Sequence, residues 1–524
     1  MTIHEKLIDA LCEEFGSEAF VHDPTIQTIP PYQNHPAWTC VLCKPTEPCD
    51  GHKDQLEVII RDAANDVYGN FGSFADLVNQ TNELDEFLLK KPGVAGLVYV
   101  MDSRTPSVKA ANRAKDETGN VPKTPFEEFQ TSDGYTAWRN YMDMYHRNPN
   151  SVSGTLGDLT QSVSTLRYSR YVRPANWMDY MKNRDFKEFI CHYLCEAKFR
   201  TMKIPPGKWL VILGPRGLAK KRSDLQELTL EKFYSNEYME ADYETVWLTN
   251  NLYREYHVTI YSRDGDVWLA NLLAHTRRII ALNDATLEHI NFGGEVVVVR
   301  HWQGKDRLSY VNIGTLWRSI KRHAYNMAAY ITVDPNFSFD QAVNTYVFLI
   351  LMMKNDYVEG FPMLPPKWIF TALRRKLGLI GLPLISGADD VRTLRIDCDA
   401  LLRLILYAYE AKFPKFAPDV EDVETSIHNL GTNHLRSMKN RFSLEKFRIA
   451  TLNAYWFMQY MIASQTGKMP PNGIDTVKVD SETHSKYGYV FTGTQDDIIR
   501  NYTGVPKIGR PKDASLAHIM MQKK

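Results

Sequence analysis

The chain of 524 residues is poor in cysteine, and it carries no excess charge of either sign. Its seven cysteines are too few for a disulfide scaffold, and most of them are expected to be reduced. Lys plus Arg and Asp plus Glu both number 62, so no global positive field attracts nucleic acid. Any basic surface must therefore be local and offset by acidic residues elsewhere.

Long apolar runs and internal repeats are also missing. The longest apolar run, near residues 346–353, is far too short to span a bilayer, and the acidic N-terminus does not resemble a secretion signal. We therefore expect a soluble, intracellular protein without a membrane partner, in the nucleus or the cytoplasm. With 44% hydrophobic and 24% charged residues, the chain can bury a large core and should divide into two or three domains.

What the chain does contain is a series of acidic residues that follow short apolar segments. Residues 56–60 and 96–101 are predicted strands, and they run directly into Asp62 and Asp102. Seven carboxylates follow such strand-like runs or open a helix: Asp62, Asp102, Glu240, Asp242, Asp264, Asp266 and Asp356. The strand-like run before Asp356 is the apolar segment 346–353.

Each of these acids also has a simpler local explanation. Acidic residues are favoured in a first helical turn, which accounts for Glu240 and Asp242 before a helix predicted over 243–253. A turn around Gly265, after the strand predicted at 257–262, accounts for the pair Asp264 and Asp266. Taken singly, each acid is best explained as a cap, turn or solvated residue, but together they indicate a cluster.

The shared position of these acids predicts a chemistry. Open α/β sheets place their ligand crevice beyond the carboxyl ends of the strands, so acids at several strand ends should meet there. Mg²⁺ and Mn²⁺ take oxygen ligands, and two ions about 3.5–4 Å apart can hold the attacking and leaving oxygens of a phosphodiester. The pattern therefore predicts a metal-dependent nuclease with two Mg²⁺ or Mn²⁺ ions.

Short motifs around these acids resemble the 5′ nuclease superfamily, which contains the flap endonucleases and the Xrn-type 5′→3′ exoribonucleases. The segment from Asp102 to Lys109 matches the family's Asp-x-x-x-Pro-x-x-Lys. Residues 260–266 and 355–362 are more similar to the exoribonuclease version than to the flap version. Other similar segments are the opening helix at 1–10, the first-aspartate strand at 58–64 and the Glu-x-Asp at 240–242.

The resemblance implies an α/β fold with a mostly parallel PIN-like sheet flanked by helices. It implies a nuclease core at residues 1–102 and 205–360, and an arch-like, substrate-holding insertion at 103–204. Residues 361–524 should form a mainly helical region with an irregular tail. The glycine-rich DNA grip that follows the last aspartate of flap endonucleases is not expected here, because residues 362–368 are rich in proline.

Basic residues of the insertion are the candidate substrate contacts. Lys109 ends the matched motif and is expected to hold a phosphate. Arg113 and Lys115 follow it and are further candidate substrate contacts. The relatives carry a second basic clamp where this chain has Asp116 and Glu117, so that second clamp is not supported.

A second basic group recurs every three residues, with aromatic residues between: Arg167, Arg170 and Arg173. Guanidinium groups on phosphates and rings under bases would suit nucleic-acid binding. A solvated helix with inward-facing tyrosines explains the pattern equally well.

Four side chains in the Pro-rich insertion 36–54 have the spacing Cys-x2-Cys-x5-Cys-x2-His: Cys40, Cys43, Cys49 and His52. Three thiolates and an imidazole suit a tetrahedral structural Zn²⁺ site. The alternative is a surface loop that happens to contain cysteine.

Three further signals favour structural roles. Lys220 to Arg222 reads as a solvated loop, and His275 as a positioned residue, because metal-assisted hydrolysis needs no separate base. Cys191 and Cys195, one helical turn apart, read as helix core rather than a second metal site.

The sequence as a whole predicts a 5′→3′ nuclease acting on RNA or DNA with a 5′ end, with RNA slightly preferred. A structure-specific 5′ flap endonuclease on DNA is one alternative. The other is a noncatalytic nucleic-acid-binding scaffold that kept the fold.

Overall fold

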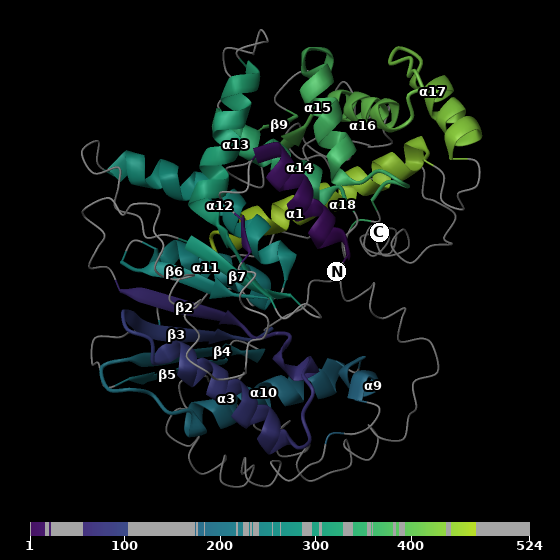
Figure 1. Ribbon diagram of the computed structural model, residues 1–524. Coiled ribbons are helices and arrows are strands. Elements are labelled where there is room, and N and C mark those ends of the chain that lie inside the picture. The colour runs from purple at the N-terminus through teal and green to yellow at the C-terminus, as the bar shows by residue number, and fades with distance from the viewer. Residues whose placement is uncertain are drawn as a thin grey trace, which may run out of the picture.

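The structure is a computed structural model of the chain. It describes residues 2–15, 20–22, 56–102, 173, 177–182, 184–215, 218–223, 230, 233, 240–253, 255–262, 264–285, 296–302, 307–328, 339–353, 358, 360–380, 384–386, 394–435 and 442–467. Figure 1 shows a twisted sheet with helices on both faces and a larger group of helices beyond one face.

The sheet has eight strands in the order β1-β8-β7-β6-β2-β3-β4-β5. The five central strands are parallel to one another: β7 (Val296–Trp302), β6 (His257–Tyr261), β2 (Glu57–Asp62), β3 (Val94–Val100) and β4 (Trp209–Gly214). Three outer strands are antiparallel to their neighbours: β5 (Leu218–Ser223), β8 (Arg307–Asn312) and β1 (Phe20–His22). The expected α/β class with a mostly parallel sheet is confirmed.

The central strands β2, β3, β4 and β6 are buried on both faces, as their mainly apolar sequences predict for parallel strands. Every residue of β3 is buried, and Ile59 and Ile60 on β2 point to opposite faces. Gly96 lets the indole of Trp209 lie against β3, because a Cβ atom at this position would stand 2.0 Å from the ring.

Different helices cover the two faces (Figure 1). On one face, α3 (Phe74–Leu89) packs against β3 and α10 (Arg184–Thr201) packs against β4, with α9 (Trp177–Lys182) beside α10. On the other face, α11 (Ala241–Leu252) packs against β2, β3 and β6, and α12 (Gly265–Ala285) lies beside it. Residue 61 therefore points towards α3 and α10, and residue 62 points towards α11.

The remaining helices form the upper part of the molecule in Figure 1. Its elements are α1 (Thr2–Phe15), α13 (Ile313–Ala328), α14 (Phe339–Leu351), α15 (Pro366–Ile380), α16 (Cys398–Lys412), α17 (Val423–Asn429), α18 (Leu444–Ser464) and the short strands β9 (Ile385–Ser386) and β10 (Arg395–Ile396). α18 contacts α11, α12 and α14, so these helices share one apolar core with the sheet. In the part of the chain that the structure describes, no helix is both long and apolar enough to cross a membrane.

Two expectations about local structure are wrong. Most of the apolar run 346–353 lies in helix α14 rather than in a strand, and its side chains are buried on all sides, which removes the periodicity that distinguishes the two. Lys220 to Arg222 do not form a loop but belong to β5, where Lys220 pairs with Ile212 of β4. Lysine is common on such edge strands because it discourages further strand pairing.

Candidate active site

The carboxyl ends of β2, β3 and β6 bring several of the predicted acids to one edge of the sheet. Asp62 is the last residue of β2 and pairs with Val100, two residues before Asp102. Tyr261, the last residue of β6, pairs with Arg61, so the segment that holds Asp264 starts beside Asp62. The parallel register thus brings the chain segments that carry these three acids to the same edge of the sheet.

Ser262 links Asp62 to Asp264. Its hydroxyl donates to Asp62 Oδ2 at 2.5 Å and accepts from the backbone N–H of Asp264 at 3.0 Å. The other oxygen of Asp62 accepts from the N–H of Ala64 at 3.2 Å. Asp264 Oδ1 accepts from the N–H of Asp266 at 3.2 Å, at the start of α12. The serine therefore orients the Asp62 carboxyl group, a role that the sequence pattern did not reveal.

Asp62 is surrounded by other acids. Its side chain is 3% exposed and forms a side-chain hydrogen bond with Asp242 of α11. The pKa of Asp62 is raised above its ordinary value, mainly by burial and further by the charge of Asp102, against the opposing hydrogen bonds from Ser262 and Asp242. Two carboxyl groups that share a hydrogen bond need a proton between them, so the fully ionised pair requires a compensating cation.

Asp102 joins two helices at this edge. Its Oδ2 lies 2.9 Å from Lys187 Nζ of α10, and its Oδ1 accepts from the N–H of Ala241 at 3.2 Å. Ala241 is the first residue of α11, whose positive helix end favours a carboxylate. Glu240 is the N-cap residue of that helix, and its N–H donates to Tyr460 Oη of α18 at 3.4 Å. The structure thus places Glu240 and Asp242 at the helix start that the sequence predicts.

Lys187 is a candidate functional residue that sequence reasoning missed. It lies 85 positions from Asp102 along the chain, and its ammonium group stands 5.5 Å from the ring centre of Tyr68. The Lys187 and Asp102 side chains are 15% and 17% exposed, so the pair is partly accessible to solvent. No local motif could have connected the two residues.

A separate group of charges lies behind the site, on the α3 and α10 face. Arg61 bonds Asp85 at 2.9 Å and Asp66 at 2.8 Å, and Lys198 bonds Asp85 at 2.7 Å. The hydroxyl of Tyr99 donates to Asp66 at 3.2 Å. Burial alone would lower the pKa of Arg61, but the two carboxylates outweigh it and raise that pKa well above its ordinary value. In this group two cations match two acids.

The donor set at the sheet edge fits Mg²⁺ or Mn²⁺ in chemical kind, because carboxylate oxygens are hard ligands. Within the described residues, however, no three His, Cys, Asp or Glu side chains are already gathered around one position for a metal. Ser262 and Lys187 engage oxygens of Asp62 and Asp102, so a cation at these oxygens must displace the lysine or share the carboxylate with it.

The other predicted site residues fall into two groups. Asp266 is half-buried and lies in the first turn of α12. The backbone N–H of Arg173 donates to the carbonyl of Gly72 at 2.9 Å, and the guanidinium of Arg173 lies 5.3 Å from the ring centre of Phe71. Residues that lie outside the described part of the chain are Asp356, Lys109, Arg113, Lys115, Arg167, Arg170, Cys40, Cys43, Cys49 and His52.

His275 and the pair Cys191 and Cys195, which the sequence assigns structural roles, lie inside helices. His275 packs edge-on against Trp317, with ring centres 5.6 Å apart, and burial lowers its pKa to about 3, so it is a poor base at neutral pH. Cys191 and Cys195 are buried in α10, as expected for core residues, and burial raises the pKa of the Cys191 thiol to about 12.

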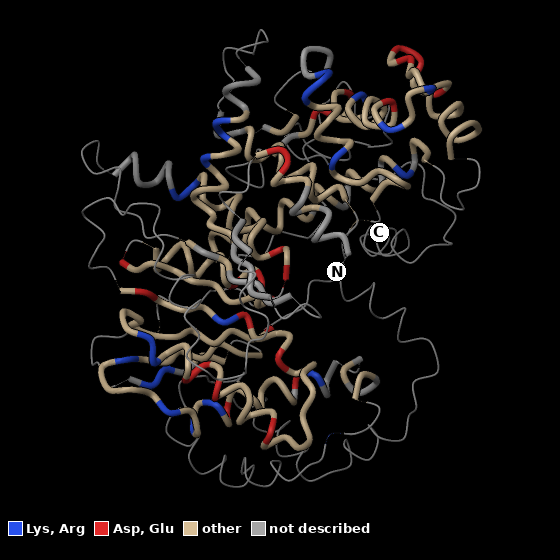
Figure 2. Tube along the Cα trace, in the orientation of Figure 1, with Lys and Arg blue, Asp and Glu red and all other residues tan. Residues whose placement is uncertain are grey.

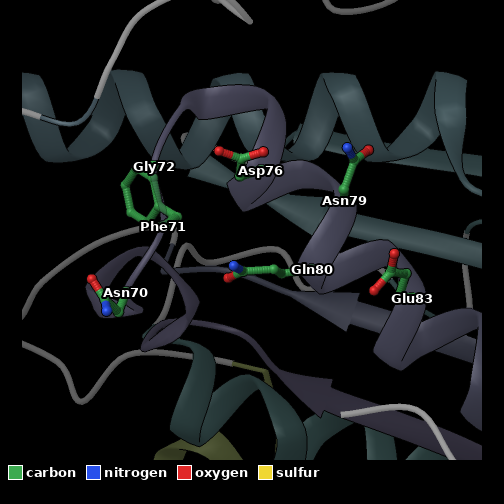
Figure 3. A pocket seen from close by; sticks show the side chains of 7 residues that line it. All are labelled: Asn70, Phe71, Gly72, Asp76, Asn79, Gln80 and Glu83. Carbon is green, nitrogen blue, oxygen red and sulfur yellow. The ribbon is translucent and has the colours of Figure 1, made fainter.

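A polar groove of about 570 Å³ lies on the outer side of α3, away from these acids (Figure 3). Its lining residues are Asn70, Phe71, Gly72, Asp76, Asn79, Gln80 and Glu83. The carboxylate of Asp76 belongs to the helix cap, where it accepts from the N–H of Ser73 at 2.7 Å. None of the acids at the carboxyl edge lines this groove, so it is not the centre of the candidate site.

Comparisons with known proteins do not extend this picture. No protein-family model and no curated protein matches the chain. The function must therefore be argued from the site itself.

Proposed function

We propose that the protein is a divalent-metal-dependent nuclease that hydrolyses phosphodiester bonds of RNA or DNA from a 5′ end. The observation that carries this proposal is the crowding of Asp62 by Asp102 and Asp242 at one edge of a mostly parallel sheet, where Ser262 links Asp62 to the backbone of Asp264. The raised pKa of Asp62 supports it further, because crowded carboxylates ionise readily only beside a compensating cation.

Two divalent cations would supply Lewis acid chemistry at the phosphate and a deprotonated water at neutral pH. Asp62 and Asp102 would hold them from adjacent strands, and Asp242 and Asp264 from helix starts, with Ser262 orienting Asp62. Glu240, Asp266 and Asp356 complete the proposed acidic set, directly or through water.

Two lysines are assigned to the substrate. Lys187 bonds Asp102 at 2.9 Å, so a cation at Asp102 would free this lysine to contact a phosphate bound beside the cation. Lys109 is proposed as a second phosphate contact. Both lysines would bind and position the substrate rather than exchange protons with it.

Attack from the 5′ end and the slight preference for RNA rest on the resemblance of residues 260–266 and 355–362 to the exoribonucleases. A 5′ flap endonuclease on DNA would use the same acids, and differs in how the insertion receives the substrate.

The direct test is cleavage by purified protein with Mn²⁺ of three substrates: 5′-phosphorylated RNA, single-stranded DNA and a flapped duplex. Labels at the 5′ or 3′ end show where cutting starts, and we expect the 5′ end. Asp102→Asn should lower the rate on the order of a thousandfold. Glu424→Gln, an exposed acid on α17, is the matched control and should leave the rate unchanged.

Cleavage that begins at the 3′ end, or no cleavage with any divalent metal, would contradict the proposal. The ion pair between Lys187 and Asp102 gives the scaffold alternative one specific support, since a lysine could replace a metal permanently. Binding of nucleic acid without cleavage, unchanged in Asp102→Asn, would favour that alternative.

A further inference from the structure

The edge of the sheet opposite the carboxylates carries a basic surface. It lies where β3 and β4 begin and β5 ends, beside the last turns of α3 and α10. Figure 2 shows Lys and Arg positions gathered at the lower left of the molecule, around β5 and these helix ends. The residues of this basic edge surface are Lys90, Lys91, Arg200, Lys203, Lys208, Lys221 and Arg222.

Hydrogen bonds tie these residues into one surface. Lys208 Nζ donates to the carbonyls of Leu89 and Lys91 at 2.6 Å, at the end of α3. Arg222 donates to the carbonyls of Phe199 and Met202 at 2.9 Å, at the end of α10. Both cations are held by backbone carbonyls at helix C-termini, which fixes their position.

Four members of the surface are exposed to solvent, and Lys221 of β5 is one of them. Lys90, Arg200 and Lys203 are exposed, and none of them forms an ion pair with another described residue. Two acids lie among them: Glu86 accepts from the backbone N–H of Lys203 at 2.7 Å, and Glu57, whose pKa is raised by burial, is attracted by Lys91 and Lys208. The surface therefore carries a local positive excess in a chain whose net charge is zero.

We propose that the basic edge surface binds the phosphate backbone of a nucleic-acid strand whose other part lies at the carboxylate site. The cations are separate and are spread over two helix ends and a strand. This arrangement suits a line of phosphates, because each phosphate can contact one cation. The strand β4, Trp209–Gly214, spans about 20 Å between the two edges, so a nucleic-acid strand that joins them must be several nucleotides long. The identity of the polyanion rests on the proposed function, whereas the positive surface itself does not.

The test measures the binding of labelled single strands by fluorescence anisotropy, without divalent cations and at several salt concentrations. The variant Lys90→Glu, Arg200→Glu, Lys203→Glu should bind a strand of about 30 nucleotides roughly tenfold more weakly at about 0.1 M salt. The slope of log affinity against log salt should become less steep by about 2, since each lost phosphate contact removes about 0.7.

The matched control is Arg322→Glu, Arg375→Glu, Lys415→Glu, which changes net charge equally at exposed residues without ion pairs in the described part. Equal affinities and slopes in the two triple variants would overturn the proposal, and so would a wild-type protein that binds no nucleic acid. The latter result would leave an acidic protein as the partner of this surface. Surface-dependent binding without cleavage would uphold this inference and refute the nuclease proposal, so the two failures are distinguishable.

Discussion

Two groups of buried acids lie on the two faces of β2, and they differ in how their charge is balanced. On the α3 and α10 face, Asp66 and Asp85 are matched by Arg61 and Lys198 at 2.7–2.9 Å. This group is neutral as a whole and holds α3, β2 and α10 together. Its acids are explained completely by structure.

On the α11 face, Asp62 lies beside Asp102 and Asp242, and it is held by a serine hydroxyl rather than by a cation. Lys187 reaches this group from the margin and bonds Asp102. Burial raises the pKa of Asp62, which disfavours its charged form. On the other face, Asp66 and Asp85 raise the pKa of Arg61, which favours the charged form of that arginine. The comparison shows that the balance of charge, rather than burial, separates a structural acid from a candidate ligand.

The largest expected effect is on the free energy of unfolding, when the neutral group of Arg61, Lys198, Asp66 and Asp85 is disrupted. Asp85→Ala leaves the cations of Arg61 and Lys198 buried without this partner, so the free energy of unfolding should fall by about 3–5 kcal/mol. Urea denaturation measures it. Glu83→Ala, an exposed acid on the same helix, should change the free energy by less than about 0.5 kcal/mol. Similar values for the two variants would show that Asp85 and its ion pairs stabilise the fold no more than an exposed acid does.

A smaller effect is expected where Lys187 meets Asp102. Lys187→Met removes a cation that competes for the carboxylate, so Mn²⁺ affinity should rise about three- to tenfold. Cleavage should fall at the same time, because a phosphate contact is lost. Lys415→Met, at an exposed position, serves as control for both measurements. An unchanged metal affinity would show that Lys187 does not compete for this site.

The smallest effect concerns the stability of the metal-free protein. Because folding raises the pKa of Asp62, the folded state binds more protons, and ionisation costs stability as pH rises above the ordinary value of 3.8. Asp62→Asn should therefore raise the unfolding free energy at pH 7 by on the order of 1 kcal/mol, and by progressively less towards pH 4. Thermal unfolding across this pH range checks the sign. A variant less stable than wild type at pH 7 would contradict the crowding of charge at Asp62.

The acids at strand ends could be predicted from the sequence because β2, β3 and β6 are short, mainly apolar runs that end close before them. It could not predict the partners of these acids. Lys187 lies 85 positions from Asp102, and Lys198 lies 113 positions from Asp85, so only the folded chain brings them together. Helix α14 was mistaken for a strand because burial on every side leaves no periodicity to read.

The most direct test of the central claim is calorimetric titration of the protein with Mn²⁺. We expect wild type to bind two ions, and Asp264→Ala, Asp266→Ala to lose most of that affinity, because it removes oxygen donors from the start of α12. The control Glu421→Ala, Glu424→Ala removes two exposed acids elsewhere and should bind as wild type does. Wild type that binds no divalent cation, or equal binding by all three proteins, would contradict a metal site at the carboxyl edge of the sheet.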